Sequence, residues 1–210
     1  MYIVPVQDLL FSLGELGGDD IEEMLKQALS VTTTFCEDVL PTTLARKTVV
    51  DTFQFTDVSL SKVGSFITLK LKHGFVDVGQ PFEIRFASTR TDLGSMDPDD
   101  SSNYALNAEQ GHVTLFSSYE IGTWCQVTYT SGFDVDSNNA FATPTVPSWL
   151  KDIAMGYATA YYKELEQLNS FLADKKGSKL HNVEPPEITK TLLNHHVRWY
   201  PTAFDPVMSI

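Results

Sequence analysis

The chain has 210 residues, a length that fits one domain or one domain carrying a large insertion. Hydrophobic residues make up 42% of it, aromatic residues 11% and charged residues 20%, a composition that supports a core and argues against global disorder. The formal net charge is −12, whereas proteins that grip phosphates carry the opposite balance, so nucleic-acid binding is not expected as the main task.

Two helices are predicted in the first 40 residues. A short one covers residues 5–13, and a longer one begins at Asp19 or Asp20, which can cap it, with a glutamate three residues later in capping-box spacing. The acidic first turn suits the helix dipole, and Pro41 ends the helix. Apolar residues repeat with the period of one buried helical stripe. They are Ile21, Met24, Leu25, Ala28, Leu29, Phe35, Cys36, Val39 and Leu40.

From about Arg46 the apolar period changes to two, which predicts strands with one buried face in antiparallel sheets. Turns rich in glycine separate these strands. Two polar, acidic stretches, 92–103 and 134–145, are predicted to be exposed loops. The alternating apolar positions are Phe53, Phe55, Ile67, Leu69, Leu71, Phe82, Ile84, Phe86, Val113, Leu115, Val127 and Tyr129.

A second long helix is predicted to begin at Pro147 or Ser148, because proline is tolerated in a first turn. Lys175-Lys176-Gly177 supplies its C-terminal signals, and residues 186–197 are predicted to form a short further helix. The apolar stripe of the long helix is Leu150, Ile153, Ala154, Tyr157, Tyr161, Leu165, Leu168 and Leu172.

The two cysteines, Cys36 and Cys125, occupy apolar-face positions, so we expect small buried hydrophobes instead of a disulfide or a ligand pair. No apolar run approaches the ~18 residues that span a bilayer. The opening residues 1–5 lack the basic start and apolar centre of a signal peptide. We therefore expect a soluble protein made in a cytosol, without membrane contact.

Sequence motifs for the common reaction classes are missing. The chain has no GxSxG elbow, no phosphate-binding loop and no HExxH. His195 and His196 are adjacent, so on a helix they point about 100° apart and do not chelate one metal easily. The acidic loops lack the Gly and Glu that an EF-hand needs at its sixth and twelfth positions. Those positions hold Ser102 and Ala108 in the first loop, and Asn139 and Thr145 in the second. We predict no enzyme, no cofactor and no metal site, and leave open a nonspecific cation.

The C-terminal residues are aromatic but have no period. Trp199, Tyr200 and Phe204 would be costly in water, at very roughly 25 cal/mol per Å² of apolar area. Either they fold back onto their own domain, or they insert into a partner. Arg198-Trp199-Tyr200 combines the three residue types that most often anchor protein interfaces, which favours a partner.

Three segments in chain order resemble the head–tail connector (adaptor) proteins of tailed bacteriophages: Val127–Phe133, Val146–Ala154 and Thr191–Arg198. That family commonly shows a last strand with Val-x-Tyr-x-x-Gly-Phe, a loop, then Val-Pro-x-x-Leu-Lys opening a helix, and a closing Leu-Leu…Arg segment. The β-rich middle is long for the smaller adaptors, which are mostly helical. An inserted β domain explains this departure.

The resemblance implies an α+β fold: a helical domain of residues 1–45 and 147–197, an inserted antiparallel β domain of 46–146, and a docking tail of 198–210. It implies a structural protein of the virion neck, assembled in the host cytoplasm as a ring of twelve copies. The ring would join the portal protein to a stopper or tail-terminator protein and surround DNA without binding it specifically. In the tail, the expected portal contacts are Arg198, Trp199, Tyr200, Phe204 and Ile210. On the first long helix, the residues expected to contact a neighbouring copy, or else to form a solvated face, are Glu22, Glu23, Gln27 and Glu37.

Two alternatives stay open. One is another virion component: a stopper, tail-completion or decoration protein. The other is a β-sandwich module that binds carbohydrate or protein, in which Trp124, Tyr119 and Tyr104 would line the site. Otherwise these three aromatic residues belong to the core or to seams between subunits.

Overall fold

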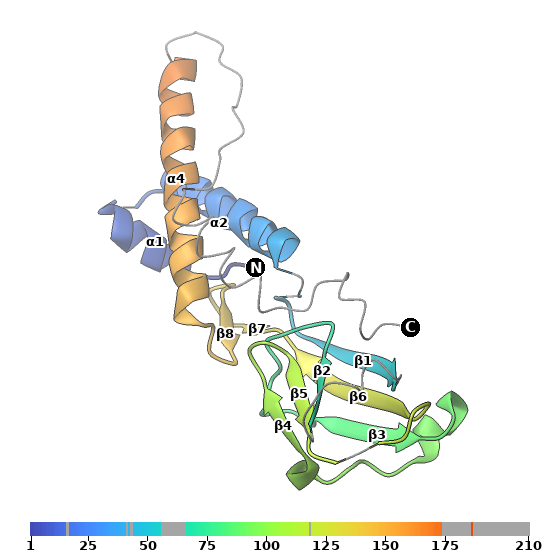
Figure 1. Cartoon of the computed structure of the whole chain (residues 1–210). Helices are drawn as coiled ribbons and strands as arrows, with labels where there is room; N and C mark the ends of the chain where they lie inside the picture. Colours follow the sequence, from blue (N-terminus) through green and yellow to red (C-terminus); the bar gives the residue numbers. More distant parts are fainter. Residues whose placement is uncertain are drawn as a thin grey trace. The chain divides into compact units, whose positions relative to one another are not determined.

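The computed structural model describes residues 1–15, 17–40, 42, 44–55, 66–117, 119–173 and 186. The chain divides into two compact units (Figure 1). One contains residues 1–40 and the described residues from 134 onward, and the other contains the described residues between 41 and 133. Helices dominate the first unit and antiparallel sheets the second, so the predicted α+β class is confirmed.

The domain boundaries expected from the sequence differ from these units at two places. Residues 41–45 were assigned to the helical domain, whereas the described ones among them group with the sheets. The sequence assigned residues 134–146 to the β domain, whereas the contacts within the chain group them with the helices. Residues 198–210, expected to form the tail, lie outside the described residues. The domain division expected from the sequence therefore stays a prediction.

The two N-terminal helices, α1 (Val6–Leu13) and α2 (Asp19–Val39), begin and end close to their expected positions. The predicted aspartate cap of α2 is wrong. Gly18 occupies the N-cap position without a side-chain hydrogen bond, and both aspartates lie in the first turn, where they favour the helix dipole. Leu40 is extended, with φ −81° and ψ 124°, because a residue that precedes proline avoids the helical region.

Helix α2 packs against the long helix α4 (Ser148–Ala173). The rings of Phe35 and Tyr157 meet edge to face at 4.8 Å between centroids. In α4, Tyr162 is buried, whereas Tyr161, which the sequence predicted to be buried, is only half-buried. The buried face of α4 is therefore displaced by one residue at this point. None of the helices in the described stretches is long and apolar enough to cross a membrane. The confirmed buried positions of the two stripes are Leu25, Ala28, Leu29, Cys36, Leu40, Leu150, Ile153, Ala154, Tyr157 and Leu165.

The acidic stretch 134–145, predicted to be a loop, contains a hairpin of β7 (Asp134–Val135) and β8 (Phe141–Thr143). The N-terminus adds to it: the Tyr2 amide donates to the Asn139 carbonyl at 2.9 Å, and the Phe141 amide donates to the Tyr2 carbonyl at 2.8 Å. The alternation that identifies longer strands is too short here to detect.

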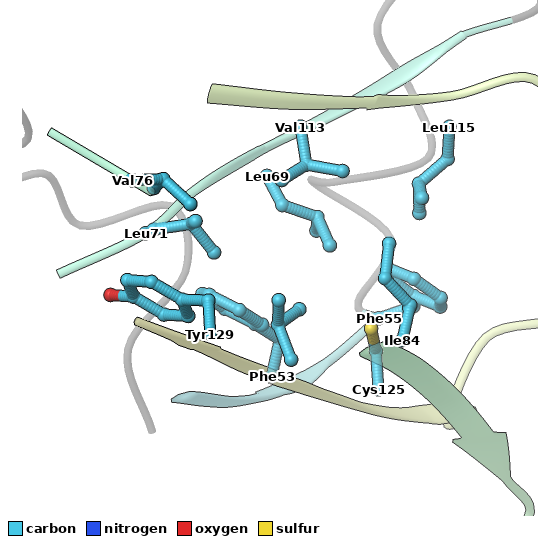
Figure 2. Close-up of a cluster of buried hydrophobic side chains, with 11 residues drawn as sticks. Phe53, Phe55, Leu69, Leu71, Val76, Ile84, Val113, Leu115, Cys125 and Tyr129 are labelled. Atoms are coloured by element: carbon cyan, nitrogen blue, oxygen red, sulfur yellow. The ribbon is translucent and has the colours of Figure 1, made fainter. Parts of the chain in front are cut away.

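The second unit is a sandwich of two three-stranded antiparallel sheets, with strand orders β1-β6-β3 and β2-β5-β4. Its inward side chains meet between the two sheets, and Figure 2 shows them pointing toward one another. The predicted alternation is confirmed most clearly on β6, where every second residue is buried. The strands are β1 (Lys47–Gln54), β2 (Ile67–Lys70), β3 (Glu83–Ala87), β4 (Tyr104–Asn107), β5 (His112–Leu115) and β6 (Trp124–Ser131).

The other predicted loop, 92–103, holds two short 3-10 helices, η1 (Arg90–Ser95) and η2 (Ser101–Asn103). Leu93 anchors this segment, since its side chain is buried while most of its neighbours are exposed. The amide of Asp99 donates to the carbonyl of Ile84 at 2.7 Å, which covers part of the free edge of β3. The segment is thus mostly exposed, as expected, but it contains 3-10 helices and is hydrogen-bonded to β3.

The chain enters and leaves the sandwich through one narrow backbone crossing. The amide of Phe133 donates to the carbonyl of Leu44 at 2.8 Å, and the amide of Arg46 donates to the carbonyl of Phe133 at 3.2 Å. Between them, Gly132 has φ 88°, and a Cβ placed on it would lie 2.6 Å from the carbonyl oxygen of Ala45. Only glycine meets both requirements without displacing backbone.

Phe75 holds a second unusual backbone position beside this crossing. Its φ is 52°, a left-handed conformation that costs a bulky residue on the order of 1 kcal/mol or more. Its amide donates to the carbonyl of Glu109 at 3.0 Å, and its carbonyl accepts from the amide of Gly132 at 3.0 Å. Its ring packs on Phe133 at 5.1 Å between centroids. These contacts hold the strained residue in place.

We predict that Gly132→Ala lowers the free energy of unfolding by about 3 kcal/mol or more, because it adds a backbone clash to an unfavourable φ. The matched control is Gly122→Ala, where φ is 89° but nothing lies within 4 Å of the added Cβ. That variant carries only the conformational cost, about 1 kcal/mol. Urea denaturation followed by circular dichroism measures both. Equal losses in the two variants would show that the close approach to Ala45 contributes nothing.

Candidate partner-binding surfaces

The expected docking tail has no geometry to report. Arg198, Trp199, Tyr200, Phe204 and Ile210 all lie outside the described residues. Their role in binding a portal therefore stays a prediction.

The acidic face expected on α2 lies on the surface of the helical unit. Glu23, Gln27 and Glu37 are exposed, and the side chain of Glu22 is 40% exposed and pairs with Lys26 at 3.5 Å. An exposed pair of this kind contributes little to stability. The helix thus presents its polar side away from its buried stripe.

A shallow hollow of about 300 Å³ lies on the same side of α2. Val31 and Phe35 are its apolar lining and are half-buried. Ser30, Thr34 and Asp38 line the rest of it. The hollow is open to solvent and is lined by both apolar and polar residues.

Among the described residues, nine large apolar side chains are exposed, and three of them are phenylalanines for which the sequence predicted no role. Phe11 of α1 is 86% exposed. Phe66 and Phe116, which flank β2 and β5, are 58% and 44% exposed, and their rings meet edge to face at 5.5 Å. Phe11 had a detectable signal, because it falls outside the i, i+3, i+7 spacing of Val6, Leu9 and Leu13. The pair at 66 and 116 had none, since only the pairing of β2 with β5 brings them together.

Two carboxylates of the acidic loops accept hydrogen bonds from backbone amides in turns. Asp100 accepts from the amide of Ser102 at 2.8 Å, and Asp136 accepts from the amides of Asn138 at 2.8 Å and Ala140 at 3.0 Å. These hydrogen bonds to the charged form lower the pKa of both carboxyl groups. Within the described residues, no three His, Cys, Asp or Glu side chains come close enough to share a metal ion.

One cluster of polar groups lies inside the sandwich. Asp51 of β1 is fully buried and accepts from the Tyr129 hydroxyl at 2.9 Å and from the Lys72 amide at 2.7 Å. The Tyr129 hydroxyl in turn accepts from the amide of His73 at 3.1 Å. Because Asp51 and Tyr129 come from one sheet and the segment 72–73 follows a strand of the other, this network ties the two sheets together.

The raised pKa values of one buried tyrosine and of both cysteines keep these groups in their protonated, unreactive forms. Burial and the neighbouring Asp51 carboxylate raise the pKa of Tyr129, so its hydroxyl remains a protonated donor. Burial raises the pKa of Cys36 to about 12 and also raises that of Cys125. Both cysteines are free and buried, which confirms the expectation that they pack as small hydrophobes.

The three aromatic residues considered for carbohydrate binding are engaged in packing. Tyr119 stacks on Phe86 at 4.3 Å, and Tyr104 packs against Phe82 at 5.5 Å. Trp124 lies under the guanidinium of Arg90 at 5.7 Å. Tyr104 and Tyr119 both lie against the core cluster, whereas Trp124 stands on the outer face of its sheet, so the three do not form one stacking platform.

No protein-family model and no curated protein matches the chain. Among solved structures, the chain is similar to one described as "Neck of empty GTA particle computed with C6 symmetry". The two are 14% identical over 97% of this chain and 92% of the other, with a TM-score of 0.47. Similarity at this level does not establish a common fold, so it does not support a function.

We predict that Tyr129→Phe lowers the free energy of unfolding by about 1–3 kcal/mol, because it removes a donor from the buried Asp51 carboxylate. The control is Tyr104→Phe, since the Tyr104 hydroxyl makes no hydrogen bond among the described residues. That variant should change stability by less than about 0.5 kcal/mol. Similar losses in both would show that the network does not stabilise the sandwich.

The same variant has an expected pH signature. An unfolded tyrosine loses its proton near pH 10, whereas folded Tyr129 keeps it because its pKa is raised. Its contribution is therefore complete below about pH 10 and is lost as pH rises above that value. Tyr129→Phe should make the alkaline fall in unfolding free energy shallower, by at most about 1.4 kcal/mol per pH unit. An unchanged slope in urea titrations between about pH 10 and 11 would contradict this.

Proposed function

We propose that this chain is a structural adaptor of a phage neck, a ring that joins a portal to a stopper or tail terminator. One observation carries the proposal. Two of the three segments that carry the resemblance to head–tail connectors lie in described elements: Val127–Phe133 in β6 and the backbone crossing after it, and Val146–Ala154 at the start of α4, with the hairpin of β7 and β8 between them. The third, 191–198, lies outside the described residues. The two described segments occur in the order strand, connection and helix start, as in the connector pattern.

The motif residues are buried, so the pattern specifies a fold. The proposed role follows from that fold. Val127, Tyr129, Phe133 and Leu150 are all at most 2% exposed. Gly132 is required by the crossing beside Ala45. Such residues specify a rigid body and contact no partner themselves. Partner contacts must therefore come from other, exposed residues, which agrees with a protein whose task is to join others.

The negative charge supports a channel role. Twelve copies with a net charge of −12 would give a ring roughly −144 in total, although each charge acts over only about 8 Å at physiological ionic strength. An acidic lumen repels phosphates, so DNA would slide through it instead of adhering.

We expect the chain to bind the portal protein of its own genome, with one copy per portal subunit, and deletion of residues 198–210 to abolish binding. The apolar and guanidinium anchors of the tail supply the reason. Native mass spectrometry of the mixed proteins measures it. The triple variant Trp199→Ala, Tyr200→Ala, Phe204→Ala keeps the chain length and controls for truncation. Binding that survives both changes would overturn the tail assignment. No complex with the intact chain would overturn the adaptor role and favour a stopper, decoration or sugar-binding protein.

We also expect the isolated chain to bind duplex DNA only weakly and without sequence preference. Fluorescence anisotropy with a labelled duplex, at low and at physiological salt, tests this. Tight binding that weakens steeply with salt would require a basic, phosphate-contacting surface and would contradict the acidic lumen. An unrelated basic DNA-binding protein provides the positive control.

A further inference from the structure

Charged side chains are separated along the strands of the sandwich. The entry end is the one where β1 begins, opposite the last residues of β6. Four basic residues lie at it: Arg46, Lys47, Lys70 and Lys72. The far end consists of the loops 88–103 and 116–123, which follow β3 and β5, and of Phe66, which precedes β2. Its acidic residues are Asp92, Asp97, Asp99, Asp100 and Glu120, and Arg90 is its one basic residue among those described.

The two loops of the far end are fastened to each other and to the core. The amide of Phe116 donates to the carbonyl of Asn103 at 2.9 Å, and the side-chain amide of Asn103 donates to Asp99 at 2.8 Å. The ring of Tyr119 stacks on Phe86 of β3 at 4.3 Å between centroids. The far end is therefore a preformed surface, and its acidic groups keep their places on it.

A pair of exposed aromatic rings lies on this acidic surface. The pairing of β2 with β5 places Phe66 beside Phe116, and their rings meet edge to face at 5.5 Å. They are 58% and 44% exposed, and Met96 and Ile121 are exposed at the same end. Apolar rings beside carboxylates fit a peptide segment that combines aromatic side chains with lysine or arginine. Phosphate groups of nucleic acids would be repelled there.

The chain itself contains a segment of this chemistry. Residues 188–204 include Lys190 and Arg198, contain no acidic residue, and end in the aromatic residues Trp199, Tyr200 and Phe204. This segment lies outside the described residues. Its charge is opposite to that of the far end and the same as that of the basic side chains at the entry end. Of the two ends, charge complementarity therefore selects the far one.

The length of the chain also favours a contact within one copy. Fourteen residues separate the end of α4 at Ala173 from residue 188. A chain of this length spans up to about 50 Å when fully extended. Tethering of this kind gives an effective concentration on the order of 1 mM. An attraction too weak to join separate molecules is then sufficient to hold the segment.

We propose that the far end of the sandwich binds segment 188–204 of the same chain before assembly. The aromatic residues of the segment pack on Phe66 and Phe116, and its two cationic groups lie among the carboxylates of the loops. The contact keeps these aromatic residues out of water while no other partner is present. It goes beyond the proposed adaptor function and does not depend on it. A portal that binds the same residues would have to displace them from the sandwich.

Photo-cross-linking of the full chain is the first test. Thr68 is exposed and lies two residues after Phe66 on the same face of β2, so Thr68→p-benzoylphenylalanine leaves the aromatic pair intact. Mass spectrometry should find its cross-links within residues 188–204. The matched control is Val78→p-benzoylphenylalanine, since Val78 is 73% exposed and follows Asp77, whose amide bonds to Thr130 near the other end of β6. No tail cross-links from position 68, or equal yields from both positions, overturns the proposal.

Two sets of substitutions in the Thr68→p-benzoylphenylalanine chain test the chemistry of the contact. Phe66→Ser with Phe116→Ser should lower the cross-linking yield roughly tenfold, the effect of removing an apolar anchor. Asp97→Lys with Glu120→Lys should lower it roughly fivefold, and high salt should also lower it. The control with the same change in net charge is Glu23→Lys with Glu37→Lys on α2, which should leave the yield unchanged.

These variants keep the proposal falsifiable. All substituted positions are exposed, so circular dichroism should show folded proteins. If the double serine variant unfolds, the lysine variants still decide. An unchanged yield in the Asp97→Lys, Glu120→Lys chain, or an equal loss in the α2 control, would overturn the charge complementarity on which the proposal rests.

An isotope-mixing experiment distinguishes a contact within one copy from a contact between copies. The Thr68→p-benzoylphenylalanine chain is prepared unlabelled and labelled with ¹⁵N, and equal amounts are mixed before irradiation. Each cross-linked peptide pair should then be wholly light or wholly heavy. Pairs of one light and one heavy peptide at the statistical proportion would assign the segment to a second copy and overturn the proposal.

The failure of this inference is separable from failure of the adaptor function. Tail cross-links from position 68, with no complex between the intact chain and a portal, would leave the contact standing and overturn the adaptor function. A portal complex of full stoichiometry, with no tail cross-links in the free chain, would overturn the contact and leave the adaptor function standing. If both stand, Phe66→Ser with Phe116→Ser should tighten portal binding, because the segment no longer has to be released.

Discussion

The sandwich depends on one backbone crossing, where the chain enters it at Ala45 and leaves it at Phe133. Gly132 allows the two segments to approach, because any side chain there would overlap the Ala45 carbonyl. The strained Phe75 closes the crossing from a third segment. Nearby, Tyr129 and Asp51 tie one sheet to the chain that follows β2 in the other. A change in any of these groups acts on both sheets, because each lies where segments distant in sequence meet.

The acidity of the chain has two separate roles. In the turns, carboxylates such as Asp100 and Asp136 accept hydrogen bonds from backbone amides. These hydrogen bonds stabilise the compact conformation of each turn. On α2 the carboxylates are solvated and oppose the approach of other acidic surfaces. Association of a chain of this charge would require apolar anchors large enough to outweigh the repulsion, and salt would change that balance.

Framework residues and exposed apolar residues occupy different positions in the described part of this protein. In the two described segments that resemble the connector family most apolar residues are buried, so these segments describe how the chain folds. The exposed phenylalanines among the described residues, Phe11 on the helical unit and the pair Phe66 and Phe116 on the sandwich, lie outside those segments. This separation permits contact surfaces to differ between proteins that keep one framework, since an exposed side chain is not constrained by core packing. Family resemblance therefore predicts the body of such a protein better than its partners.

The sequence by itself determined the α+β class, the two long helices and the alternating strands, because amphipathic periods of 3.6 and 2 arise directly from which positions are buried. It also identified both cysteines as core residues. Only the tertiary structure decided which surfaces are available. The 134–145 stretch became a hairpin because the N-terminal Tyr2 pairs with it, the Asp51 network formed across sheets, and Phe66 met Phe116 through strand pairing. Each of these depends on contacts between residues far apart in the chain, and no local pattern encodes such contacts.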